Sequence, residues 1–331
     1  MKTTALRGEL ASVDLRPFEA SDYPALVEIA NLVYPDHPTT VEDERHDDGT
    51  WDVQRYFRRR YVAEASSGGV VATAIAHHLP WGFHPQRFGV WISVHPDWQR
   101  RGVGRAMYEN VLGDLLPFHA NALRTWVQET KTESIAWLAR RGFAELMRGW
   151  ESRLDLTAFD PERFAARWDV PAGVEIVTLE DELKEDPERL HLAWDLHNAT
   201  NPDAPRIDEF TPVSYEMFRG HVLRGPRSMP EAFFLAKVGD TYVGQSDLER
   251  NQALPDVFYT GYTGVRREYR GRGIAYALKL RAIDYARRHG SREIRTWNNT
   301  LNAPMLGINV ALGFVKQRAW ITLGKDLSGS G

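Results

Sequence analysis

Hydrophobic and polar positions follow two periods along the chain. Stretches such as "SVDLRPF" and "EIRTWN" alternate and predict strands, whereas "DYPALVEIANLVY" repeats apolar residues every three or four positions and predicts an amphipathic helix. The segment "RYVAEASSGGVVATAIAHHL" is typical of a hairpin that turns at Ser-Ser-Gly-Gly. Hairpins combined with strand–helix–strand stretches predict an α/β fold of α+β character, in which a mixed sheet is flanked by helices.

The predicted elements occur twice at a constant spacing. A shift of 171 residues carries "LRTW" at 123–126 onto "IRTW" at 294–297 and "RRGF" at 140–143 onto "ALGF" at 311–314. A constant shift without insertions indicates duplication of a domain-sized unit. We therefore expect an N-terminal domain at 1–156, a proline-containing linker at 157–173, a C-terminal domain at 174–327 and a flexible tail at 328–331.

Composition narrows the class of protein. The 331 residues carry a formal net charge of −4 and contain no cysteine, which excludes disulfides, thiolate metal sites and cysteine nucleophiles. The charge argues against broad binding to nucleic acid or to anionic membranes. The first residues lack the apolar stretch of a signal peptide, and no segment has the roughly 18 apolar residues of a membrane span. We expect a cytoplasmic protein without a metal ion.

An arginine- and glycine-rich loop lies between an apolar strand and a helix in each copy. The two sequences are "WQRRGVGRAMYENVL" at 98–112 and "YRGRGIAYALKL" at 269–280. Free N–H groups at a helix N-terminus bind phosphate when no side chain obstructs them. The loops carry neither the dinucleotide fingerprint nor a Walker lysine. A single loop of this kind is usually a solvated turn, but the repeated context favours a phosphate site.

Both loops resemble the signature of the GNAT superfamily of acyl-CoA-dependent N-acyltransferases, Gln/Arg-x-x-Gly-x-Gly/Ala. The matching residues are Gln99, Arg100, Arg101, Gly102, Val103 and Gly104 in the first copy, and Arg270, Gly271, Arg272, Gly273, Ile274 and Ala275 in the second. The resemblance implies that these residues bind the pyrophosphate of acetyl-CoA. It also implies that the preceding strand, around Ser93 and Val94 or Thr263 to Val265, binds the pantetheine arm, and that a main-chain N–H polarises the thioester carbonyl.

Two carboxylates are candidates for the general base that the amine acceptor requires. An alkyl ammonium has a pKa near 10.4 and must lose a proton before it attacks. Glu249 and Asp247 close the strand "YVGQSDLER" beside the expected acceptor cleft. The alternative is that both are exposed carboxylates at a strand end. His95 comes directly before a proline and is more typical of a turn residue.

The family resemblance also identifies where an acid for the leaving thiolate would lie. Many members carry a tyrosine seven residues after an asparagine on the last helix. In the second copy Asn302 matches the asparagine, but Asn309 occupies the tyrosine position and cannot act as an acid. Water, Tyr262 or no acid at all remain as alternatives. The first copy has Lys131 and Leu138 at these positions, which predicts that it is catalytically weaker.

The sequence thus predicts an N-acetyltransferase whose C-terminal domain transfers an acetyl group from acetyl-CoA to a primary amine of a small molecule or peptide. We expect a monomer or homodimer. The alternative is an acyl-CoA sensor without turnover, because neither copy keeps the acid.

The loops at 34–44 and 201–210 suit lids over a cationic amine, or plain surface loops. Trp126 and Trp297 are expected in the core, with a place in the acceptor groove as the alternative.

Overall fold

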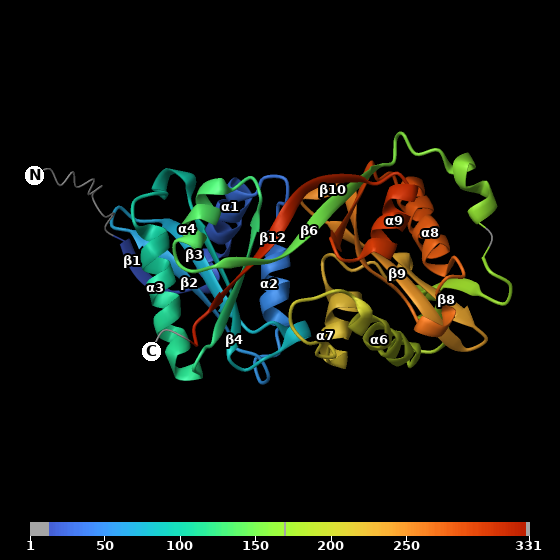
Figure 1. Ribbon diagram of the computed structural model, residues 1–331, viewed down its shortest axis with the longest axis horizontal. Coiled ribbons are helices and arrows are strands. Elements are labelled where there is room, and N and C mark those ends of the chain that lie inside the picture. Colours follow the sequence, from blue (N-terminus) through green and yellow to red (C-terminus); the bar gives the residue numbers. More distant parts are fainter. Residues whose placement is uncertain (1–12, 169, 329–331) are drawn as a thin grey trace, which may run out of the picture. The chain divides into compact units, whose positions relative to one another are not determined.

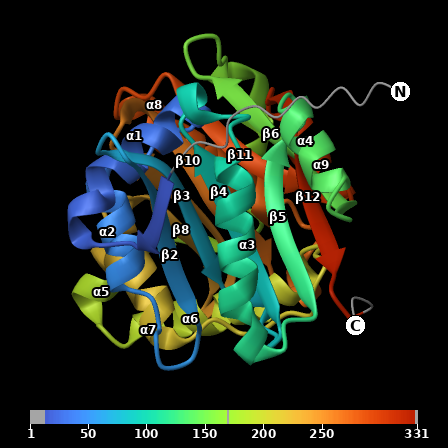
Figure 2. The ribbon, with the colours of Figure 1, turned by 90° about the vertical axis from the view of Figure 1, so that its left-hand side faces the viewer.

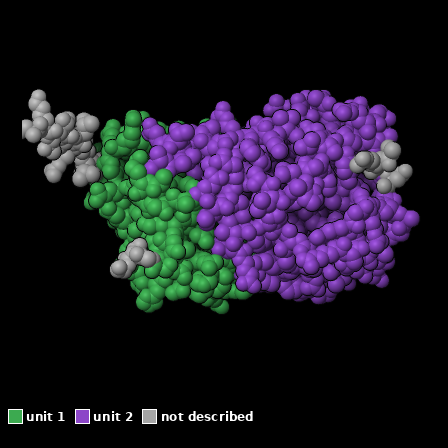
Figure 3. Space-filling model, viewed as in Figure 1, with its two compact units in different colours: residues 1–126, 137–144, 323–331 green, residues 127–136, 145–322 purple. Residues whose placement is uncertain are grey.

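The computed structural model describes residues 13–168 and 170–328. The chain divides into two compact units, coloured separately in Figure 3. Unit 1 comprises residues 1–126, 137–144 and 323–331, and unit 2 comprises residues 127–136 and 145–322. These units are defined by packing rather than by the repeat, so the domain boundaries expected from the sequence stay a prediction. Residues 329–331 of the expected tail lie outside the described residues.

Unit 1 is built on a sheet with α3 across one face (Figure 2). Its strands, in spatial order, are β1 (Val13–Pro17), β2 (Arg58–Ala65), β3 (Val70–His77), β4 (Arg87–Val94) and most of β5 (Ala122–Gln128). Its helices are α1 (Tyr23–Val33), α2 (Val41–Gly49), α3 (Val103–Leu115) and part of α4 (Thr132–Ala139). The first four strands pair antiparallel, whereas β4 and β5 are parallel. The sheet is therefore mixed, because a helical crossover joins its parallel pair.

Unit 2 is likewise built on a mixed set of paired strands (Figure 1). Its strands, in spatial order, are β12 (Val315–Asp326), β6 (Ala144–Asp155), β11 (Glu293–Asn299), β10 (Leu254–Val265), β9 (Thr241–Asn251), β8 (Phe233–Val238) and β7 (Glu175–Thr178). Its helices are α5 (Leu179–Glu185), α6 (Arg189–Thr200), α7 (Tyr215–Arg219), α8 (Ile274–Arg288) and α9 (Ala303–Ala311). A mixed sheet flanked by helices confirms the predicted fold class.

The strand β6 pairs outside its own sequence copy. Within unit 2 it runs antiparallel to β11, with Glu293 opposite Asp155 and Asn299 opposite Gly149. The last residues of β12, 323–326, belong in turn to unit 1. Alternation along a strand specifies which face is buried but leaves its partner open. For this reason the sequence predicted β6 as a strand without predicting its neighbour.

Two apolar cores cover the two faces of the sheet in unit 2. Residues of α8 and of the segment that follows α9 contribute to one core, which includes Leu278, Ile283 and Phe314. Residues of α5, α6 and α7 form the other, which includes Leu196 and Phe218. The two faces are called here the α8 face and the α6 face. The sheet is thus buried on both sides, as the near-continuous apolar run of β8 requires.

The repeat seen in the sequence recurs in the structure with the same spacing. The helices α3 and α8 begin at Val103 and Ile274, and β5 and β11 span 122–128 and 293–299, each 171 residues apart. The expectation that Trp297 is a core residue is wrong, since it is 40% exposed. Trp297 lies beyond Arg295, where the register of β11 with β10 ends, so it is in the part of β11 that has separated from β10. Across residues 13–168 and 170–328, no helix combines the length and the apolarity needed to cross a membrane.

Candidate functional site

The two arginine–glycine loops have the same backbone geometry. Arg100 and Gly271, which correspond through the repeat, both have positive φ angles, at 61° and 74°. Gly102 and Gly273 are the N-caps of α3 and α8 and are also left-handed, at 87° and 82°. Left-handed residues in alternation turn successive N–H groups toward a common point, which is an anion-binding arrangement. In the first copy Arg100 adopts this conformation despite its side chain, whereas in the second copy a glycine adopts it without strain.

The first signature residue of each loop ties the loop to the end of the preceding strand. Gln99 Nε2 donates to the carbonyl oxygen of Val94 at 3.0 Å, and Arg270 Nε donates to that of Val265 at 2.9 Å. Both pairs are related by the repeat. The side chains of Gln99 and Arg270 therefore bond the strand end, in addition to any contact that they make with a phosphate.

An acidic residue beyond α6 binds the arginines of the second loop. The Asp203 carboxylate accepts hydrogen bonds from Arg267 and Arg270. The hydrogen bond from Arg267, with that from Arg270, lowers the pKa of Asp203 well below its ordinary value despite partial desolvation. Arg272 instead lies over the ring of Tyr269, 5.1 Å from its centroid, as Arg101 lies over Trp98. Sequence reasoning did not anticipate this contact between the loop at 201–210 and the arginines.

Strands β10 and β11 separate beyond their first few residues. They pair in parallel at 257–259 with 293–295, and their register ends there within the described residues, although β10 continues to Val265 and β11 to Asn299. Strands β4 and β5 behave in the same way, pairing at 87–89 with 122–124. Each copy thus presents a strand end with free main-chain groups beside its glycine loop, as binding of a pantetheine arm requires.

A β-bulge in β10 distinguishes the second copy. Thr260 lies opposite Leu248, but Thr263 lies opposite Ser246, so β10 has one extra residue. The corresponding pairing of β3 with β4 runs without a break from Ala72 opposite Val94. At the bulge, the Tyr262 N–H donates to Asp247 Oδ1 at 3.0 Å. Bulges of this kind redirect main-chain groups near functional sites.

Asp247 and Glu249 lie side by side on the α6 face, two residues apart on β9. Burial and then the charge of Glu249 raise the pKa of Asp247 to about 7. Burial acts on Glu249 in the same direction, but a hydrogen bond from His221 Nε2 at 3.2 Å and the charges of His221 and Arg227 leave its pKa below the ordinary value. Asp247 is thus the member of the pair that changes protonation near neutral pH.

The glycine opposite these carboxylates has no room for a side chain. A Cβ built on Gly261 would collide with Asp247 Oδ2 and lie 2.6 Å from Glu249 Oε1. The two carboxylates are therefore packed directly against the backbone of the bulge. The sequence placed both residues at a strand end, but it gave no signal for the bulge or for His221, which belongs to the π-helical turn Gly220–Arg224.

The first copy has no acidic pair in this place. The repeat matches Val94 with Val265, and the residues opposite them are Ala72 and Gly244. Counted from these two residues along β3 and β9, Ile75 takes the position of Asp247. His77 takes the position of Glu249. Burial lowers the pKa of His77 to about 4, which leaves it neutral and weakly basic. A cavity of about 210 Å³ lies on this face, lined in part by Ile75, Trp91 and Ser93. Unit 1 therefore keeps a pocket beside its loop without a pair of buried acids.

The helix α9 carries the two asparagines that the family signature singles out. The Asn302 side chain caps the helix by accepting from the Met305 N–H at 3.4 Å. Asn309 is buried and donates from Nδ2 to Asn298 Oδ1, while its own Oδ1 has no partner within the described residues. A buried, unpartnered acceptor accommodates an N–H or S–H donor from a ligand.

Tyr262 lies away from α9, on the α6 face. Its ring is 5.2 Å from the ring of His197 on α6, and burial raises the pKa of its hydroxyl. His197 contacts Gln245 and Asn201 through its two ring nitrogens, and burial lowers its pKa to about 4. Tyr262 and the neutral His197 thus lie on the α6 face, the face that also carries Asp247. His197 was not among the residues expected from the sequence, because a lone histidine on a helix has no distinguishing pattern.

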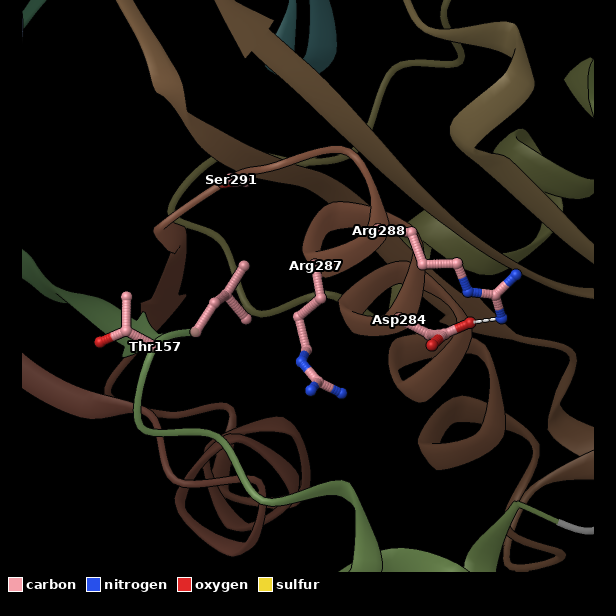
Figure 4. Close-up of a pocket in the computed structure, with 6 residues that line it drawn as sticks. Thr157, Asp284, Arg287, Arg288 and Ser291 are labelled. Carbon is pink, nitrogen blue, oxygen red and sulfur yellow. Dashed lines mark hydrogen bonds and ion pairs between the residues drawn. The ribbon is translucent and has the colours of Figure 1, made fainter.

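Another cavity, this one in unit 2, lies at the C-terminal end of α8. It measures about 270 Å³ and is lined in part by Thr157, Asp284, Arg287 and Arg288, with Asp284 and Arg288 paired (Figure 4). The fourteen residue steps of α8 place it roughly 20 Å from the glycine loop. A helix C-terminus also disfavours anions. The cavity is therefore separate from the loop, the bulge and the acidic pair.

The loop, the strand end and α9 of the second copy could together hold a ligand that carries a phosphate. A Cβ built on Gly271 or Gly273 would meet no atom within 4 Å, so the space beside these two glycines is open. The strand end at Val265 is beside them, and Asn309 Oδ1 supplies a buried acceptor. Among the described residues no group of acidic or histidine side chains could hold a metal ion.

The sequence profile of the acetyltransferase (GNAT) family matches residues 26–143 and 190–314. No curated protein sequence matches the chain. The tandem match confirms the resemblance that the two loops predicted, and it covers more than half of the chain.

Solved structures share the tandem fold. A tandem GNAT protein from the clavulanic acid biosynthesis pathway, solved without AcCoA, has a TM-score of 0.75 at 21% identity, covering 95% of this chain and 98% of that one. A GCN5-related N-acetyltransferase from Sphaerobacter thermophilus has a TM-score of 0.68 at 19% identity, covering 95% of each chain. A glucosamine N-acetyltransferase region of a fungal multi-domain beta-N-acetylglucosaminidase has a TM-score of 0.70 at 14% identity, covering 95% of this chain and 38% of that one. At these identities the likeness establishes the fold alone.

Proposed function

The chain belongs to the acetyltransferase (GNAT) family and is a GNAT-type N-acetyltransferase, and we propose that its second copy carries the reaction. In this proposal an acetyl group moves from acetyl-CoA to a primary amine of a small molecule or peptide by direct attack. The observation that carries it is the pair formed by buried Asp247 and partly buried Glu249 beside the bulge of β10. The first copy has Ile75 and His77 there.

The acidic pair supplies the base. Asp247, whose pKa is about 7, accepts the proton that the bound ammonium must lose, directly or through a water molecule. Glu249 stays ionised beside His221 and keeps the pKa of Asp247 high. Two carboxylates on a buried face also attract a cationic acceptor, which favours an amine over a neutral alcohol.

The glycine loop and the strand end position the donor. The N–H groups around Gly271 and Gly273 bind the pyrophosphate, and the free main-chain groups near Thr263 and Val265 bind the pantetheine arm. This places the thioester at the bulge, between the α8 face and the α6 face. The acceptor approaches from the α6 face, where Asp247 and Tyr262 lie.

An assay of thiol release tests the proposal. The full chain is incubated with acetyl-CoA and, separately, with polyamines, aminoglycosides, amino sugars and peptides that have free N-termini. The proposal expects free CoA with at least one amine, and none with the matching alcohols. If acetyl-CoA binds but no amine releases CoA, the alternative of a sensor without turnover is supported instead.

A further inference from the structure

A lysine lies buried on the helix that follows the glycine loop of the second copy. Lys279 on α8 is only 3% exposed. Within the described part of the chain, its recorded contact is the ring of Phe314, whose centroid lies 5.3 Å from Nζ. No carboxylate pairs with it there. Buried ammonium groups are rare without a partner, because desolvation disfavours the charge.

The helix geometry directs Lys279 toward the donor site. It is four residues after Ala275, the last residue of the signature, so both lie on the same face of α8 one turn apart. Leu278, the residue before it, packs toward β9 instead, at the place where a Cβ on Gly244 would lie 3.2 Å away. Phe314 follows the end of α9, and its N–H donates to the carbonyl oxygen of Asn309 at 2.9 Å. Lys279 thus lies between Ala275 and the end of the helix that carries Asn309.

On this geometry we propose that Lys279 is the proton donor to the CoA sulfur, the role that Asn309 cannot fill. The inference rests on the proposed function of the second copy. The amine nitrogen attacks the thioester carbonyl carbon, the C–N bond forms, and the C–S bond breaks with its electron pair on sulfur. Asp247 first passes the proton of the ammonium to solvent and then takes the second proton, which nitrogen loses as the amide forms. Lys279 gives one proton to sulfur, forming the CoA thiol, and regains it from solvent.

The electrostatic surroundings of Lys279 suit this transfer. Burial lowers its pKa to about 8, and Asp247 on β9 is the charged group that opposes the shift. The contact from the segment after α9, the ring of Phe314, is neutral. A thiol ionises near pH 8.5, so the proton moves between groups of similar acidity. An unpaired ammonium also stabilises the leaving thiolate before the proton moves.

The first copy differs at this point. The repeat matches Lys279 with Tyr108, and it matches Phe314 with Phe143. The ring centroids of Tyr108 and Phe143 are 6.3 Å apart. Tyr108 is buried, and its hydroxyl accepts from Lys325 Nζ at 3.2 Å. The first copy therefore has a phenol in place of the ammonium at this position, in keeping with the proposal that the second copy is the active one.

Ionisation of bound CoA tests the inference without any acceptor. The parent is the full chain with Gly104→Glu, which blocks the first loop, and CoA with its free thiol is the probe. The thiolate is followed by its ultraviolet absorbance as pH rises. We expect the bound thiol to ionise at least about one pH unit below the 8.5 of a free thiol in the parent. Lys279→Met should abolish this shift, Lys279→Arg should keep it, and Lys184→Met, at an exposed lysine, should leave it unchanged.

Turnover provides the second measurement. With an amine found in the thiol-release assay, Lys279→Arg should lower kcat at least tenfold and leave the KM for acetyl-CoA within about twofold, because arginine keeps the charge but does not release its proton. If the thiol of bound CoA ionises at the same pH in the parent and in Lys279→Met, the inference about Lys279 is overturned while the proposed function stands. A parent that binds no CoA overturns the proposed function as well. Lys279→Met should fold, because it replaces a buried charge with an apolar chain.

Discussion

The backbone N–H of Tyr262 donates a hydrogen bond to Asp247 Oδ1 at 3.0 Å, so the bulge of β10 and the buried carboxylate hold each other in position. In the proposed reaction this bond links the strand that would bind the donor with the group that would deprotonate the acceptor. It also explains why the bulge and the acidic pair occur together in the second copy, since a bulge frees the N–H that the carboxylate accepts.

The first prediction concerns the base. Asp247→Asn keeps the acceptor for the Tyr262 N–H but cannot take a proton, and we expect kcat to fall about 100-fold or more. In the unmodified protein kcat should rise with pH through about 7, where Asp247 loses its proton. The measurement is a pH profile of kcat with an amine that is accepted. A profile that keeps its limb near pH 7 in Asp247→Asn would assign that limb to another group.

The same substitution should change stability in a pH-dependent way. The pKa of Asp247 is raised on folding, from an ordinary value of 3.8 to about 7, so its ionisation opposes folding once the pH exceeds about 4. The cost grows until about pH 7 and is constant above it. Asp247→Asn should therefore raise the Tm at pH 8 and leave it nearly unchanged at pH 3.5. An equal Tm difference at both pH values would contradict the raised pKa.

Gly261 provides a steric test of the site. Gly261→Ala places a Cβ against Asp247 and Glu249, and one of the carboxylates must move. We expect kcat to fall at least tenfold while the Kd for acetyl-CoA changes little, as measured by calorimetry. Gly307→Ala is the control, because a Cβ on this glycine of α9 meets no atom within 4 Å. It should stabilise the protein by up to about 1 kcal/mol.

Asp203 should oppose binding of acetyl-CoA. It occupies Arg267 and Arg270, both of which lie at the phosphate loop. Asp203→Asn frees these arginines, and we expect the Kd for acetyl-CoA to fall about two- to fivefold at low salt, in keeping with the modest strength of exposed ion pairs. The effect should shrink at high salt. Asp240→Asn, at an exposed acid that pairs with Arg189, is the control; a weaker affinity in Asp203→Asn would contradict this account.

The sequence predicted the parts of the fold that depend on local pattern. The strand before each loop, the helix after it and the constant shift of the repeat all follow from hydrophobic periodicity and identical residues. The partner of β6 could not be predicted in this way, because an alternating strand pairs equally well with any neighbour that buries the same face. The loops at Gly102 and Gly273 were identified by their arginines and glycines in front of a helix, repeated in both copies.

The candidate site was predicted less completely, because its groups converge from segments far apart in the chain. Asp247 and Glu249 were selected by their place on one strand, but His221 and the bulge carry no local signal. The ion pairs of Asp203 depend on how the loop after α6 folds back. Lys279 looked like a polar position on an amphipathic helix, and only its burial marks it as unusual.

The claim that the second copy performs the transfer is tested most directly by a matched pair of variants. Gly104 and Ala275 correspond through the repeat, and both lie in the first turn of a helix beside the phosphate loop. A glutamate at either place repels the pyrophosphate. We predict that Ala275→Glu lowers amine-dependent release of CoA at least 100-fold, while Gly104→Glu keeps it within about twofold of the unmodified protein. Loss of turnover in Gly104→Glu with full turnover in Ala275→Glu would contradict the account and assign the reaction to the first copy.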